Sequence, residues 1–312
     1  SMATFKRTGG VSVFKEKFIS GMLKKGYPQE FAESCFKQIE GFGSYGFPES
    51  HAASFALLVY VSCWLKCHYP DVFAAALLNS QPMGFYAPAQ IIRDAGEHGV
   101  EVRAVDINRS DYWTVLEDGP RAAERLWSRH AEMREDIRAT KAIRLGFTEI
   151  KGIKEEHAMT LMARRGAGYG SVRDLWLRTG LPLSTLEKLA EADAFGSLGL
   201  NRRQALWAVR GLEGSEGAET LPLFRLAETP PPPRAEIEHS LPLMRHSEDV
   251  VHDYRTMSFS LKAHPMRFLR RDLERRRIVR CADLEKLRNG QRVEVAGLVL
   301  VRQRPGTASG VV

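Results

Sequence analysis

The feature that most restricts how this chain folds is an uncharged run of 14 residues, Ala52 to Leu65. The run is too short to span a bilayer, which needs about 20 apolar residues of helix. It therefore predicts a helix from about Ala52 to His68 that other parts of a protein bury. Three glycines, a proline and the pair Ser50-His51 stand in the turn before it. Such a turn either caps the helix or brings an anionic ligand to the helix N-terminus.

Helical patterns dominate the remainder, and short strands interrupt them. Apolar residues recur at helical spacing in 14–42, 70–78, 88–98 and 183–210. Alternating residues predict strands at 100–105, 142–147 and 293–301, and 112–116 is suited to pair with the first of these. The predicted fold class is therefore mainly α with small β elements.

Composition divides the chain into parts. Residues 1–2 are typical of a tag remnant and are set aside, and 211–240 is rich in Gly, Glu and Pro, which predicts an extended linker. The chain stops soon after the apolar strand 293–301. One strand cannot close a sheet, so we expect a fragment that is cut inside a β domain.

Positive charge gathers near the C-terminus. Residues 1–260 carry 32 Lys and Arg against 33 Asp and Glu, whereas residues 261–312 carry 13 against 5. A local basic excess favours a polyanionic partner, and a solvated basic helix is the equally weighted alternative.

Neither a metal site nor a catalytic carboxylate set stands out. Cys63 and Cys67 lie one helical turn apart, but no second pair of ligands accompanies them, so buried thiols are the favoured interpretation. Four carboxylates close in sequence are interpreted as a solvated rim: Asp106, Asp111, Glu117 and Asp118. Polymerases and nucleases need carboxylates that converge on metal ions, and this chain offers no such set.

Two helix-turn-helix units carry the strongest chemical signal. In the first, the turn Lys151-Gly152-Ile153-Lys154 precedes a helix, an arrangement that directs backbone N–H groups at a phosphate. Lys154 stands where the pattern usually has a second glycine. The side chain hinders close approach of the backbone to DNA, but its positive charge is suited to a phosphate. The second unit ends in Arg202-Arg203 at a helix start, also a phosphate-facing arrangement. Duplication favours DNA binding over units that only pack.

The linker contains one candidate docking peptide. It is TLPLF, whose apolar and leading positions are Thr220, Leu221, Leu223 and Phe224. An extended segment of this kind either docks into a hydrophobic groove of a partner or anchors onto its own domain, and we favour the second.

Several long motifs resemble bacterial family C DNA polymerases, and most closely their error-prone, ImuC-type branch. The motifs extend over nearly the whole chain, and they are YGFPESHAASFALL, WLKCHYPDVFAAALLNSQPMGFYAPAQIIRDA, HGVEVRAVDIN, ADAFGSLGLNRRQALWAVR and SLKAHPMRFLR. The replicative alpha subunit of DNA polymerase III is similar over the same motifs.

The resemblance implies a layout. Residues 3–140 would be the later part of a helical fingers domain, and 141–210 a tandem helix-hairpin-helix region that binds DNA. After the linker 211–240, residues 241–312 would be a connector and the truncated start of an OB-fold. The palm and its metal-binding aspartates would lie outside the chain, so it would contain no catalytic residue and would be inactive alone.

The resemblance also implies partners. Tyr45, Ser50 and His51 would contact the incoming dNTP, and primer–template DNA would contact the helix-hairpin-helix region. The parent enzyme would transfer deoxynucleotides with Mg²⁺, in the cytoplasm and away from any membrane. Segment 220–224 occupies the position of the sliding-clamp motif in degenerate form, so clamp binding would be indirect, through an ImuB-type mutasome protein. The alternative is a non-catalytic docking module for such partners.

Overall fold

The computed structural model describes residues 14–45, 49–84, 86–212 and 241–299, and the side chains of 41–52 are outside this description. The chain forms two compact units, 1–66 and 67–312. Each unit is described by itself.

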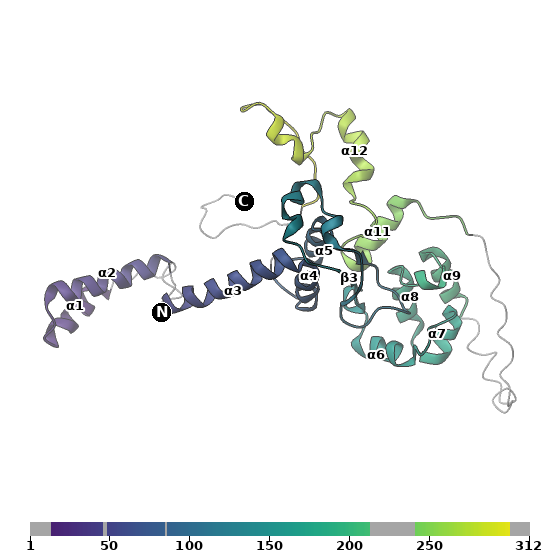
Figure 1. Cartoon of the computed structure of the whole chain (residues 1–312), viewed down its shortest axis with the longest axis horizontal. Coiled ribbons are helices and arrows are strands. Elements are labelled where there is room, and N and C mark those ends of the chain that lie inside the picture. The colour runs from purple at the N-terminus through teal and green to yellow at the C-terminus, as the bar shows by residue number, and fades with distance from the viewer. Residues whose placement is uncertain (1–13, 46–48, 85, 213–240, 300–312) are drawn as a thin grey trace. The chain divides into compact units, whose positions relative to one another are not determined.

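The first unit is a set of helices (Figure 1). Helices α1 (Lys15–Lys24) and α2 (Gln29–Tyr45) form a hairpin, in which the rings of Phe18 and Phe36 lie 5.7 Å apart. Phe36 is buried there. The two helices are joined by a short turn in which Gly26 adopts a φ of +82°, a backbone conformation that favours glycine.

Helix α3 (Glu49–His68) begins three residues earlier than the predicted start at Ala52. The expected burial is not provided by the described residues, because side chains 53–64 are all exposed. Among them are Leu57, Val59 and Tyr60. A helix that is apolar on all sides is normally a buried one.

The second unit is built around a small sheet. Strands β1 (Val102–Arg103), β2 (Val115–Asp118) and β3 (Lys141–Arg144) lie in the order β1-β3-β2, with β1 parallel and β2 antiparallel to β3. Ile143 pairs with Val102 on one side and Leu116 on the other. Helix α4 (Pro70–Asn79) packs on the sheet and on α5 (Pro88–Glu97).

Helices make up most of the rest of this unit. The segment 121–141, expected to be helical, contains only the short 3-10 helices η3 (Ala122–Glu124) and η4 (Ser128–Glu135). The other elements are η5 (Phe147–Glu149), α6 (Glu155–Arg164), α7 (Val172–Thr179), α8 (Leu183–Glu191), η6 (Gly196–Leu198), α9 (Arg202–Arg210), α11 (His246–Met257), α12 (Met266–Arg275) and η7 (Cys281–Lys286). The fold class, mainly α with small β elements, is confirmed.

One hydrophobic core runs through the sheet and the helices that follow it. Ile143 and Phe147 belong to the same buried cluster as Leu161, Leu186 and Phe195. Strand β3 starts at Lys141 and pairs with two strands that precede residue 140. The predicted division between 140 and 141 therefore does not coincide with a break in packing, and its functional meaning stays a prediction.

The predicted strand 293–301 is not formed in its described part, residues 293–299. Its only ladder contact there is an isolated bridge between Val279 and Val295, with the Val279 N–H donating to the Glu294 carbonyl at 3.0 Å. No neighbouring strand within the described residues is available to extend the pairing. The truncated OB-fold stays a prediction. No helix in the described residues has the length and apolar character needed to cross a membrane.

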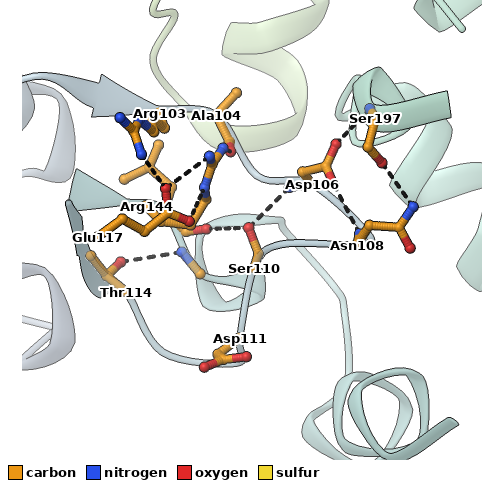
Figure 2. Close-up of polar contacts among 12 residues, drawn as sticks. Arg103, Ala104, Asp106, Asn108, Ser110, Asp111, Thr114, Glu117, Arg144 and Ser197 are labelled. Atoms are coloured by element: carbon orange, nitrogen blue, oxygen red, sulfur yellow. Dashed lines mark hydrogen bonds and ion pairs between the residues drawn. The ribbon is translucent and has the colours of Figure 1, made fainter. Parts of the chain in front are cut away.

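A chain of ion pairs crosses the sheet from edge to edge (Figure 2). Arg144 donates from Nε and Nη2 to the two carboxylate oxygens of Glu117 at 2.9 and 3.0 Å, and from Nη1 to the Ala104 carbonyl at 2.8 Å. Arg103 donates to Glu117 at 2.6 Å and to Glu101 at 2.8 Å. Hydrogen bonds from Arg144 and then Arg103 lower the pKa of Glu117 from 4.5 to about 2.

Replacing Glu117 by Gln should destabilise the second unit near neutral pH by about 2–3 kcal/mol, since each pKa unit is worth about 1.4 kcal/mol. The folded pKa lies below the unfolded value. The contribution of Glu117 is therefore complete above pH 4.5 and disappears as the pH falls towards 2. Urea unfolding at a series of pH values measures this difference.

Asp118→Asn is the matched control for Glu117→Gln. Asp118 lies on the same strand and binds Lys141, but its side chain is 98% exposed. Solvent screens such a pair, so the control should leave the unfolding curve nearly unchanged. Equal destabilisation by the two substitutions would contradict the role assigned to Glu117.

Candidate nucleic-acid interface

The first predicted DNA-binding turn, residues 151–154, lies in a tight hairpin, residues 150–154, between η5 and α6. Gly152 has a φ of +76°, in the left-handed region that favours glycine. Lys154 is the N-cap residue of α6 and has an extended backbone. The first N–H groups of a helix lack intrahelical partners, so the hairpin ends at a site suited to an anion.

Lys151 does not face solvent as a free cation. Its backbone N–H donates to the Thr256 carbonyl at 3.0 Å, and its Nζ donates to the carbonyls of Arg255 and Tyr254 at 3.1 and 3.4 Å. These carbonyls belong to the last turn of α11, where a positive charge also stabilises the helix dipole. Lys151 therefore fastens the hairpin to α11.

The centre of the hairpin is held from the other side by α8. Lys188 Nζ donates to the Gly152 carbonyl at 2.7 Å, and Ile153 packs against the core. A Cβ added to Gly152 would lie 3.1 Å from Lys188 Nζ. Sequence reasoning missed Lys188, because nothing in the pattern around a lysine inside α8 indicates a contact 36 residues away.

Lys154 is the hairpin cation that is open to solvent. Its side chain is 68% exposed, and its Nζ lies 3.2 Å from Oε1 of Glu156, which is equally exposed. An ion pair in such surroundings contributes little and exchanges readily for another anion. Of the four predicted hairpin contacts, Lys154 is the one whose charge is most available to a phosphate.

The prediction that Arg202 faces a phosphate is corrected by its position. Its side chain is 1% exposed, and its guanidinium binds two carboxylates of α11. Nη1 donates to Asp249 Oδ1 at 3.1 Å, and Nη2 donates to Asp253, which is also buried. A buried, paired guanidinium is not available to DNA. It joins α9 to the segment that follows the linker.

Arg203 is only partly engaged. Its Nη1 donates to the Pro242 carbonyl at 2.6 Å, and its Nη2 lies 3.7 Å from Glu248. Asn201 caps α9 in a reciprocal capping box with Gln204, so the helix start itself forms as expected. Arg203 remains a predicted DNA contact.

More charges surround Arg202 and Asp253 and form a cluster around this buried pair. Lys262 Nζ binds Asp193 at 2.7 Å and lies 3.5 Å from Asp249. The Ser260 hydroxyl donates to Asp253 Oδ2 at 2.6 Å. This ion cluster (Asp193, Arg202, Asp249, Asp253 and Lys262) therefore joins the turn after α8, helices α9 and α11, and the segment that follows α11.

The interpretation of Asp106 and Glu117 as a solvated rim is wrong. Asp106 is buried, and its two carboxylate oxygens accept the backbone N–H groups of Asn108 and Ser197 at 2.9 and 2.8 Å (Figure 2). Ser110 donates to the Leu145 carbonyl and accepts the Asp106 N–H. Asp106 therefore organises a turn. Asp118 and, in part, Asp111 do lie in solvent.

The remaining predicted sites lie outside the described side chains. Tyr45 is the last residue of α2, and Ser50 and His51 lie in the first turn of α3. Their backbone is described, but their side chains are not. Thr220, Leu221, Leu223 and Phe224 lie entirely outside the described residues. Within the described part of the chain, no three His, Cys, Asp or Glu residues form a group suited to hold a metal ion.

Glu149 gives the hairpin region a pH-dependent stability. Its carboxyl lies just before the hairpin, and burial raises its pKa from 4.5 to about 7. The folded pKa lies above the unfolded value, so the stabilising effect of the bound proton is complete below pH 4.5 and is lost as the pH rises through 7.

Glu149→Gln should therefore be more stable than the parent chain at pH 8, by about 2–3 kcal/mol at most. The two should converge near pH 4.5. Thermal unfolding at pH 5, 6, 7 and 8 tests this, and Glu156→Gln, on the exposed face of α6, is the control. A difference between Glu149→Gln and the parent that does not change with pH would contradict the prediction.

Arg202→Met should destabilise the second unit by about 3–5 kcal/mol, because it leaves the buried carboxylate of Asp253 without its cation. The double substitution Arg202→Met/Asp253→Leu should recover a large part of this loss. Urea unfolding measures both, with Arg203→Met as the matched control. A loss from Arg203→Met as large as that from Arg202→Met would contradict the assignment.

Comparison of the sequence with known proteins identifies a motif family and close relatives. A helix-hairpin-helix motif family matches residues 99–205. The error-prone DNA polymerase of Sinorhizobium medicae WSM419 is 58% identical over 313 aligned residues, and error-prone DNA polymerase 1 of Rhizobium meliloti 1021 is 57% identical over 314. Both alignments cover 100% of this chain and 28% of the relative. The resemblance predicted from the motifs is confirmed: over its whole length, this chain is homologous to a segment of bacterial error-prone DNA polymerases.

Proposed function

We propose that this chain is the nucleotide-closing and DNA-gripping segment of an error-prone DNA polymerase that acts in lesion bypass. The observation that carries the proposal is the hairpin 150–154, which places the exposed Lys154 at the N-terminus of α6. The match of 99–205 to the helix-hairpin-helix motif supports it.

The hairpin is suited to a phosphate and not to a base. Backbone N–H groups, the helix dipole and Lys154 all recognise negative charge, which is the same at every nucleotide. Because Lys151 and Lys188 hold the hairpin from two sides, it meets DNA already ordered. Such contacts position a duplex without reading its sequence, as a polymerase that accepts any template requires.

The proposal assigns nucleotide binding to the first unit. Ser50 and His51 lie in the first turn of α3, where the positive end of a helix favours a triphosphate, and Tyr45 ends the preceding helix. Transfer of the nucleotide would take place in the whole polymerase with Mg²⁺. The described residues offer no carboxylate cluster for that ion, so its ligands are proposed to lie outside them.

The wider assembly follows from the same proposal. The parent protein would work on primer–template DNA in the bacterial cytoplasm, where the chromosome is. An ImuB-type mutasome protein would recruit it, and the sliding clamp would act indirectly, because Thr220 and Pro222 disturb the clamp-motif position.

A second candidate function is a non-catalytic docking module for mutasome partners. The buried, paired position of Arg202 favours it, because a charge that was expected to face DNA is not available there. The side chain of Lys151 is exposed but already hydrogen-bonded to α11. The near-neutral charge of residues 1–260 points the same way.

Lys154→Ala distinguishes the two candidates. It should weaken binding of the chain to labelled primer–template DNA several-fold at 50 mM salt and lower the salt slope by about 1, because one phosphate contact is lost. Fluorescence anisotropy at several salt concentrations measures both quantities. Lys141→Ala, which removes the same charge from a surface ion pair outside the hairpin, is the control.

Equal effects of Lys154→Ala and Lys141→Ala would mean that only net charge matters, and the hairpin proposal would fail. Unchanged DNA binding together with co-purification of a mutasome partner in the absence of DNA would favour the docking module.

A further inference from the structure

We propose that α12 and the two residues after it form a second DNA-backbone contact, separate from the hairpin. The surface consists of four arginines, here called the open arginines: Arg267, Arg271, Arg276 and Arg277. The inference rests on the proposed DNA-binding function and adds a site to it.

Carboxylates do not neutralise this segment. Residues 266–277 contain six arginines and two acids. Asp272 binds Arg275 at 3.2 Å, and Glu274 binds Arg280 at 2.6 Å. Both acids are thus occupied. Within the described residues, no ion pair or hydrogen bond engages the side chains of the open arginines.

The open arginines are also accessible. Helix α12 contains no buried residue, and all four open arginines are exposed. Arg267 and Arg271 are four residues apart, so they lie on the same face of the helix, one turn from each other. Like charges at this spacing repel each other, and a bound polyanion removes that repulsion.

A fifth arginine of α12, Arg270, is incompletely hydrogen-bonded. Arg270 Nη1 is buried, and it has no hydrogen-bond partner within the described residues. A buried donor without an acceptor is costly, and an anion that reaches it would restore the lost hydrogen bond. Arg270 lies one helical turn from Arg267, so a phosphate bound near Arg267 is also near Arg270.

The composition of α12 favours DNA over the other surface that attracts basic helices, an anionic membrane. Interfacial helices bury a continuous apolar face in the lipid. The apolar residues of α12 are Met266, Phe268, Leu269 and Leu273. The ring of Phe268 already lies 5.4 Å from that of His246 in α11, which leaves only the other three for a lipid surface. Guanidinium groups match phosphate oxygens with two hydrogen bonds each, and they bind DNA backbone wherever it is presented.

The test compares two double variants that change the net charge of the full chain equally. Arg267→Ala/Arg271→Ala removes two open arginines, whereas Arg275→Ala/Arg280→Ala removes two that already bind carboxylates. The first should weaken binding to labelled duplex or single-stranded DNA about tenfold near 50 mM salt and lower the salt slope by about 2. The second should weaken it less than about twofold. The charges of Arg275 and Arg280 are already balanced in part by the carboxylates of Asp272 and Glu274.

Three results decide the inference. Retention of most of the affinity by Arg267→Lys/Arg271→Lys would support a charge contact. Equal weakening by the two alanine variants would reduce the effect to net charge and overturn it. Binding to phosphatidylserine vesicles that depends on Arg267 and Arg271, with DNA binding unchanged, would also overturn it.

Comparison with Lys154→Ala separates this inference from the proposed function. If Lys154→Ala weakens DNA binding and the α12 variant does not, the hairpin function stands and the inference fails. If the α12 variant alone weakens binding, the α12 contact stands and the hairpin function fails. Circular dichroism checks that α12 still folds, as expected for a helix without buried residues.

Discussion

The ion pair between Arg202 and Asp253 is the interaction on which the second unit depends most. Both side chains are almost completely buried, so neither charge is tolerable without the other. The pair joins α9, which precedes the linker, to α11, which follows it. The linker therefore does not separate independent domains. Helix α11 packs against α8, and the ion pair joins it to α9.

Helix α11 also holds the hairpin 150–154 in place. The last turn of α11 accepts hydrogen bonds from Lys151, and α8 supplies Lys188 to the Gly152 carbonyl. Because the ion cluster fixes α11 and the hairpin is bonded to α11, a change in the cluster should also displace the hairpin. Three basic residues that look like phosphate ligands in the sequence thus divide into two structural groups: Arg202 and Lys151 position the turn, and Lys154 is held only by an exposed ion pair with Glu156.

The sequence predicted element types and the hairpin because they depend on local patterns, such as helical spacing, Gly152 and the helix start after Lys154. It could not predict which charges are buried. Arg202 and Arg203 are neighbours at the same helix start, and only the partner carboxylates on α11, about 50 residues away, make one a buried clamp and leave the other partly exposed. Asp106 was misread for the same reason, because its backbone partner Ser197 is 91 residues distant. The strand predicted at 293–301 fails for a different reason. An alternating pattern forms a strand only where another strand pairs with it, and residues 293–299 have only the isolated bridge from Val279 to Val295.

Two helices of the described chain leave side chains exposed to solvent, and the two kinds of side chain differ. Helix α3 exposes apolar side chains from 53 to 64, and α12 exposes arginines without counter-ions. Water compensates these differently: it solvates exposed guanidinium groups well, but it opposes exposure of apolar area at roughly 25 cal/mol per Å². Helix α3 therefore needs a protein neighbour, and α12 only gains from an anion. That asymmetry suits α3 to packing against apolar protein surface, whereas the contact that we propose for α12 would be reversible and salt-dependent.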